Sequence, residues 1–176
     1  MITKLQLAAT LFLSALAATA AQGQKHEEKS SMADCSMMKD AAAMEERGDK
    51  AMGFSHEKTT HHFILANDGG AIEVSANDAT DQSSREQVRG HLGHIAKMFQ
   101  EGNFKIPMLV HGSLPDGAAV MKQQKTRISY ACEATEVGGR VRIRTSDPKA
   151  LKAVHAFLRF QITEHHTGDP LEISGS

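Results

Sequence analysis

Histidine and methionine cluster in the segment VRGHLGHIAKMF, residues 88–99, which has the periodicity of a helix. At about 100° per residue, His91, His94 and Met98 form one stripe, next to an apolar stripe that would face a core. Two imidazoles one turn apart and a thioether one turn further can face a single ion. Such donors suit copper or, with a carboxylate in place of the thioether, zinc. The segment therefore predicts a metal site on a helix.

Two further histidines could complete this site. The apolar alternation around residues 61–65 places His61 on the inward face of a strand and His62 on the opposite face. His111 ends a short apolar segment, residues 106–111, which we interpret as another strand. The predicted metal ligands are therefore His91, His94, Met98, His61 and His111. The same stripe is also typical of packing at a core boundary, where a carbonyl or water satisfies the imidazole.

The remaining histidines are not assigned as ligands. His155 aligns with a core position of its helix, and His165 and His166 end that helix, where a cation favours the negative end of the dipole. The segment HEKTTHH lacks the second histidine of HExxH, so metalloprotease chemistry is not indicated.

Soft donors also occur upstream, where residues 21–53 are polar and alanine-rich. They are His26, Met32, Cys35, Met37, Met38 and Met44. Sulfur donors in a flexible exported segment favour copper(I), although the segment could equally be a plain spacer. Cys35 could instead pair with Cys132, and Cys132 could equally be a buried core thiol.

The N-terminus has the pattern of a secretory signal peptide. Lys4 precedes an apolar run, and Ala18-Thr19-Ala20 offers a cleavage site. No later segment approaches the roughly 18 apolar residues of a membrane span. We expect a soluble periplasmic or secreted protein without membrane insertion.

Composition argues against several classes of function. The net charge of −1 provides no basic field for nucleic acid. No phosphate-binding glycine motif, haem-attachment CxxCH or nucleophile motif is present. We therefore expect no nucleotide, no haem and no catalytic residue.

The fold follows from an internal repeat. HHFILANDGGAIEVSA and RISYACEATEVGGRVRIRT each read as a β-hairpin with a Gly-Gly turn, and a helix follows each. Ser83 with Glu86, and Asp147 with Pro148, predict the starts of these helices. The expected class is α+β, with two ββα repeats forming an antiparallel sheet and both helices on one face.

The expected organisation is a signal peptide (1–20), a flexible leader (21–53), one domain (54–168) and a frayed tail (169–176). The first helix would bury Val88, Leu92, Ile95 and Phe99, and the second Leu151, His155, Leu158 and Ile162. An arginine row at 140, 142 and 144 could meet Glu73 and Glu133, and we interpret it as a solvated sheet face.

The stretches MGF…KTTHHF, HLGHIAKMF and FLRFQITEH carry a resemblance across nearly the whole domain. The chain resembles a group of small exported bacterial proteins, some of which carry the name aspartate carbamoyltransferase. These residues do not support that activity, because the chain is too short for the two-domain enzyme and lacks a Ser-Thr-Arg-Thr-Arg phosphate loop. After His111 the group continues with Asp and a Pro-Pro-Gly-Val turn, whereas this chain reads GSLPDGAAV. The resemblance implies a shared exported domain and no particular catalytic residue.

The sequence thus predicts an exported metal-binding protein, copper first and zinc second. One alternative is a domain that binds a small ligand or a partner, with the stripe of His91, His94 and Met98 lining a pocket or a homodimer seam. A second is an exported enzyme.

Overall fold

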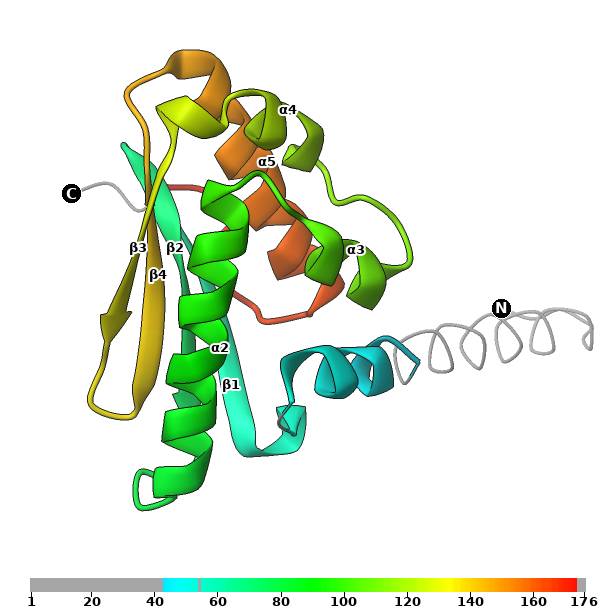
Figure 1. Cartoon of the computed structure of the whole chain (residues 1–176), viewed down its shortest axis with the longest axis vertical. Coiled ribbons are helices and arrows are strands. Elements are labelled where there is room, and N and C mark those ends of the chain that lie inside the picture. The colour runs from blue at the N-terminus through cyan, green and yellow to red at the C-terminus, as the bar shows by residue number, and fades with distance from the viewer. Residues whose placement is uncertain (1–42, 54, 174–176) are drawn as a thin grey trace, which may run out of the picture. The chain divides into compact units, whose positions relative to one another are not determined.

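A computed structural model describes residues 43–53 and 55–173 of the chain. The predicted signal peptide and the predicted leader up to residue 42 lie outside these residues. Residues 43–52 are helical. The elements that follow are η1 (His56–Lys58), β1 (Thr59–Ala66), β2 (Gly69–Ala76), α2 (Gln82–Gln100), α3 (Lys105–His111), α4 (Ala118–Gln123), η2 (Lys125–Arg127), β3 (Ser129–Ala134), β4 (Gly138–Arg144) and α5 (Pro148–Glu164) (Figure 1).

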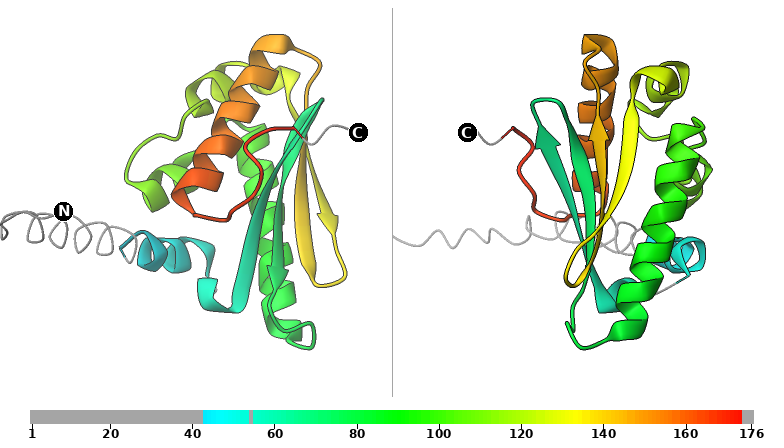
Figure 2. Two further views of the ribbon diagram at one scale, coloured as in Figure 1. Left: turned by 180° about the vertical axis from the view of Figure 1, so that it is seen from behind. Right: turned by 60° about the vertical axis from the view of Figure 1, so that its left-hand side comes forward.

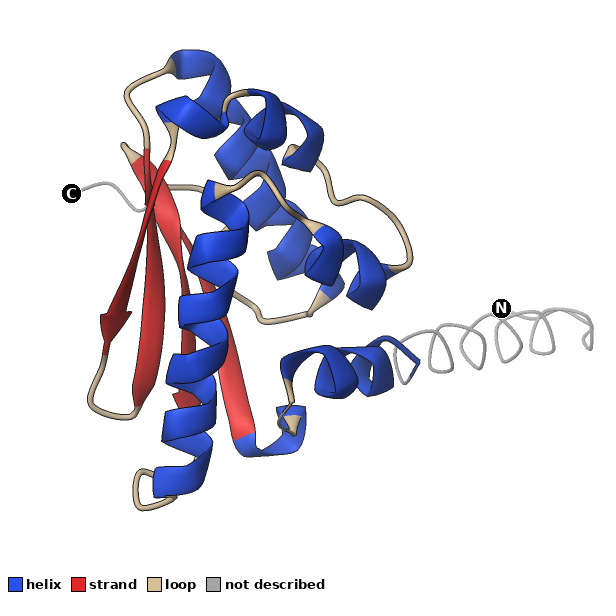
Figure 3. Cartoon of the chain, in the orientation of Figure 1, coloured by secondary structure: helices blue, strands red, loops and turns tan. Residues whose placement is uncertain are grey.

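The four strands form one antiparallel sheet in the order β1-β2-β4-β3. The expected α+β class is confirmed, and Figure 3 shows the strands as one layer with the helices beside it. A hairpin precedes each long helix, and α3 and α4 lie between the two hairpin–helix units. The internal repeat itself stays a prediction.

The two Gly-Gly pairs do not form the hairpin turns. The turns lie at residues 67–68 and 135–137, and the glycines begin β2 and β4. Close packing explains their position, because a Cβ at Gly138 would collide with the carbonyl oxygen of Val74 and one at Gly69 with that of Ile143. The glycines therefore allow the two central strands to approach each other.

Both long helices cover the same face of the sheet. A Cβ at Gly70 would strike Leu158 of α5, and one at Gly139 would lie 3.1 Å from Leu92 of α2. The two views of Figure 2 show α2 and α5 side by side against the strands. This face carries the buried side chains of Phe63, Leu65, Ile72, Val74, Val141 and Ile143.

The helix starts agree in part with the sequence. Asp147 caps α5 as expected, and its carboxylate accepts hydrogen bonds from the N–H groups of Lys149 and Ala150. The cap of α2 is Asp81, which accepts from the Ser84 N–H, so the predicted Ser83 cap is wrong. An aspartate two residues earlier performs the same role.

The buried face of α2 is the predicted one, whereas that of α5 is broader. Leu151 and His155 are only half-buried, and Val154 and Phe157 are buried in their place. Phe157 meets the rings of Phe99 and Phe104, and helix α4 packs on α5. Backbone contact is close there, since a Cβ at Gly117 would strike the Ala153 carbonyl.

Residues 106–111, which the sequence predicts as a further short strand, belong to helix α3 instead. Pro107 lies in its first turn, where a missing N–H breaks no helical hydrogen bond. Gly112, with φ of 70°, ends the helix in the left-handed conformation.

The outer face of the sheet carries the arginine row. Arg140 pairs with Glu73 at 2.6 Å, as expected, and Arg142 and Arg144 both pair with Asp68. Cys132 is exposed because β3 is an outer strand, so the buried-thiol alternative is wrong. Cys35 lies outside the described residues.

We expect Gly138→Ala to lower the free energy of unfolding by about 1–3 kcal/mol, because the new Cβ has no space beside β2. The matched control is Gly93→Ala on the exposed face of α2, where a Cβ meets nothing within 4 Å. The control should gain about 0.5–1 kcal/mol from helix propensity. Chemical denaturation measures both, and equal effects of the two changes would contradict the close approach of the strands.

Candidate functional site: a four-histidine cavity

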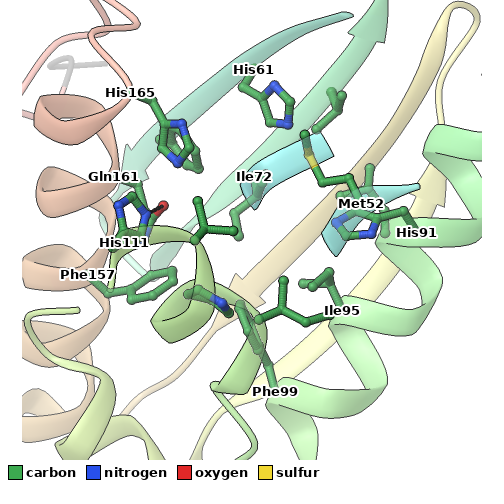
Figure 4. A pocket seen from close by; sticks show the side chains of 17 residues that line it. Met52, His61, Ile72, His91, Ile95, Phe99, His111, Phe157, Gln161 and His165 are labelled. Carbon is green, nitrogen blue, oxygen red and sulfur yellow. Dashed lines mark hydrogen bonds between the residues drawn. The ribbon is translucent and has the colours of Figure 1, made fainter. Parts of the chain in front are cut away.

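A cavity of about 90 Å³ lies between the sheet, α2, α3, α5 and the helical residues 43–52. Four histidines line it, one from each of four different segments (Figure 4). They are His61 of β1, His91 of α2, His111 of α3 and His165 just after α5. We name this space the four-histidine cavity. Its other lining residues are apolar apart from Gln161, and none of its lining residues is acidic or a thiol.

Three of these imidazoles form a continuous ring cluster. The His61 and His165 rings are nearly parallel with centroids 6.1 Å apart, and the His111 ring meets that of His165 edge-on at 4.9 Å. Phe63 lies beneath, 5.5 Å from His165. His91 approaches from α2, and Figure 4 shows it next to Met52, on the other side of the cavity from His111.

The chain after α5 holds His165 in place. Asp169 accepts hydrogen bonds at 2.8 Å from the Phe63 N–H and from Nδ1 of His62 on β1. Thr167 donates its hydroxyl to the same carboxylate. Asp169, which the sequence analysis assigns to the frayed tail, therefore ties the residues after His165 to the edge of the sheet.

Residues 43–52 close one side of the cavity. Gly48 and Met52 line it, and Met52 packs against the hydrophobic core. Arg47 Nε donates to the carbonyl of Val110 on α3 at 2.9 Å, and Asp49 accepts from the backbone N–H of His56. This part of the predicted leader is thus packed on the domain.

Burial keeps the imidazoles uncharged at neutral pH. Burial, with a smaller contribution from neighbouring histidines, lowers the pKa of His61 and of His91 to about 4 and that of His165 to about 3. The pKa of His111 is also lowered by burial, against the opposing effect of its hydrogen bond to Gln161. Uncharged imidazoles present lone pairs to a ligand without proton competition.

His111 and Gln161 form a hydrogen-bonded pair at the cavity wall. Nε2 of His111 lies 3.1 Å from Oε1 of Gln161. The two other polar atoms of the pair, His111 Nδ1 and Gln161 Nε2, are buried and have no hydrogen-bond partner in the described part of the chain.

The structure brings together three of the five predicted ligands, His61, His91 and His111, and separates the other two. His94 is exposed and Met98 is buried, and neither lines the cavity. The α2 face toward the cavity runs through His91, Ile95 and Phe99, and the other two positions rotate away from it.

Sequence reasoning missed His165, Gln161 and Met52. The spacing of four between Gln161 and His165 puts both on one side of α5, and this was the signal available. Nothing in the sequence showed that this side would meet α3.

The histidines surround the cavity without already forming a coordination shell. Among residues 43–53 and 55–173, no three His, Cys, Asp or Glu side chains form a group that could hold an ion. An ion in the cavity would therefore draw the imidazoles inward by changes of side-chain rotamer.

Comparison with known protein families, with curated proteins and with solved structures finds no match to this chain. Within the described residues, no helix has the length and apolar character to cross a membrane.

The buried histidines predict an acid-sensitive fold. Their pKa values in the unfolded chain are near 6.5, so the unfolded state takes up protons between pH 6.5 and 4 while the folded state does not. The free energy of unfolding should therefore fall as the pH drops through this window. Carboxylates such as Asp169 and Asp147, whose pKa is lowered, act at lower pH.

Denaturation at several pH values tests this expectation. His61→Phe together with His165→Phe removes two titrating groups and keeps two rings, so its stability should depend less on pH between 6.5 and 4. Parallel curves for the variant and the wild type would show that these imidazoles do not carry the acid sensitivity.

Proposed function

We propose that the protein binds copper(I) in the four-histidine cavity, with zinc(II) as the weaker alternative. The observation that carries the proposal is the convergence of four uncharged imidazoles and the Met52 thioether on one cavity. Imidazole and thioether are donors that soft copper(I) accepts. His61, His165 and His111 are already in ring contact, so they are the nearest candidates for a first pair of ligands.

Charge favours a monovalent ion. None of the residues that line the cavity is a carboxylate or a thiol, so no negative charge there offsets the ion. Transfer of an unbalanced charge to apolar surroundings is costly, and the cost rises steeply with the charge. A divalent zinc ion would therefore bind less well here than copper(I).

Export and the sulfur-rich leader fit the same role. A periplasmic or secreted protein with a signal peptide would meet copper outside the cytoplasm, and the leader methionines would add soft donors upstream of Met52. These parts of the proposal rest on the sequence, because the leader up to residue 42 lies outside the described residues.

Anaerobic titration of the protein with copper(I), against a competing coloured chelator, tests the proposal. We expect one tightly bound equivalent and weaker binding of zinc(II). His61→Phe with His165→Phe should weaken copper binding by more than the roughly 10–100-fold loss that follows removal of a residue that only supports a ligand.

His94→Ala is the matched control, because His94 is an exposed histidine outside the cavity. It should leave the affinity for copper(I) unchanged. If His94→Ala abolishes binding, the ion lies on the outer side of α2 and the cavity is not the site. If only deletion of residues 21–42 abolishes binding, the leader holds the ion.

A further inference from the structure

Gln161 is the most deeply buried polar side chain in the four-histidine cavity. It is only 4% exposed, and its Nε2 has no hydrogen-bond partner among the described residues. His111 bonds to Gln161 through Nε2, and its other ring nitrogen, Nδ1, is also buried and has no hydrogen-bond partner among the described residues. A buried polar atom without a partner is unfavourable, so the Gln161 amide calls for a binding partner.

The unpartnered amide atom of Gln161 is a donor in one arrangement of the pair and an acceptor in the other. If His111 Nε2–H donates to Gln161 Oε1, an amide N–H donor and the Nδ1 lone pair remain. If the amide is turned over, its oxygen and a His111 Nδ1–H remain instead. A hydroxyl can pair with the Gln161 amide in either arrangement, because it both donates and accepts. A metal ion can satisfy only a lone pair, and an anion can satisfy only a donor.

The surroundings select the rest of the ligand. Phe157, Ile72 and Val110 line the cavity with the pair, and the rings of His165 and Phe63 lie close by. A charged molecule would find no opposite charge among these residues. The cavity of about 90 Å³ is smaller than the roughly 150 Å³ cavity that holds benzene, so a single small ring that protrudes toward the opening is the largest body that fits.

We infer that the cavity also binds a small neutral organic molecule that consists of a single apolar ring and one hydroxyl-type group. The hydroxyl forms a hydrogen bond with the unpartnered amide atom of Gln161, as acceptor or donor according to the orientation of the amide. This role is independent of copper binding in the metal-free protein. When copper(I) draws the imidazoles inward the two ligands exclude each other, because the cavity of about 90 Å³ has no room for both.

Phenol and benzene are the probes, since they differ by one hydroxyl. Calorimetric or NMR titration of the metal-free protein at pH 7 should show that phenol binds about tenfold or more tightly than benzene. In Gln161→Leu, which keeps a side chain of similar size, this preference should fall to near parity. Retained benzene binding in that variant shows that the cavity is intact.

Gln82→Leu is the matched control, since Gln82 is exposed on α2 and its side chain donates to Glu86, away from the cavity. It should keep the full preference for phenol. A preference that survives Gln161→Leu would overturn the inference, because the hydroxyl would then bind elsewhere. Equal binding of phenol and benzene to the wild type, or no binding of either, would also overturn it and would leave ordered water as the partner of the pair.

Addition of copper(I) separates this inference from the copper proposal. Displacement of phenol by copper(I) is the expected result. If copper(I) fails to bind while the phenol preference and its loss in Gln161→Leu are seen, the copper proposal fails and the inference stands. If copper(I) binds and phenol remains bound with unchanged affinity, the inference that the two ligands share the cavity is wrong.

Discussion

The rest of the structure depends on two close contacts between helix and sheet. Leu158 of α5 packs over Gly70, and Leu92 of α2 packs over Gly139. The glycines remove the Cβ atoms that would otherwise hold α5 and α2 away from the central strands. The same two helices then form opposite sides of the four-histidine cavity, with α3 and residues 43–52 closing the space between them. A cavity between two helices on one sheet face is thus a direct result of where each helix rests.

The chemical character of the cavity follows from what surrounds the histidines. Aromatic and aliphatic residues desolvate the imidazoles, and each imidazole makes protonation of its neighbours less favourable. A carboxylate in the cavity would have reversed this effect by stabilising the imidazolium. Asp169 instead lies beside His62 and the Phe63 N–H, where it holds the chain in position without adding charge to the cavity. Uncharged donors in apolar surroundings are the common basis of both proposed ligands.

The sequence predicts those features that depend on local periodicity and capping. Alternation at His61 and Phe63 gave the inward face of β1, and the apolar spacing gave the buried face of α2. The start of α5 is also predicted from adjacent residues, Asp147 and Pro148. His61 and His91 are predicted on this basis, whereas His111 is predicted from a strand that is helix α3 instead; all three line one cavity.

The features that the sequence did not predict depend on tertiary contacts. Residues 106–111 are apolar enough for a strand, whereas in the structure they form helix α3, which lines the cavity together with α2 and α5. The Gly-Gly pairs resemble turns because close approach of a neighbouring strand has no local signature. The sequence shows His165 only as the residue at the end of α5. Its place at the cavity depends on Asp169, which ties the following residues to β1.

The most direct test of the account is long-range ¹H–¹⁵N NMR of the imidazole nitrogens, recorded for the metal-free protein and after one equivalent of copper(I). The account predicts neutral imidazole signals for His61, His91, His111 and His165 at pH 7, and large shifts on copper addition at several of these four. His94 and His155 should not shift. Imidazolium signals in the cavity, or copper-induced shifts confined to His94 or to histidines outside the cavity, would contradict it.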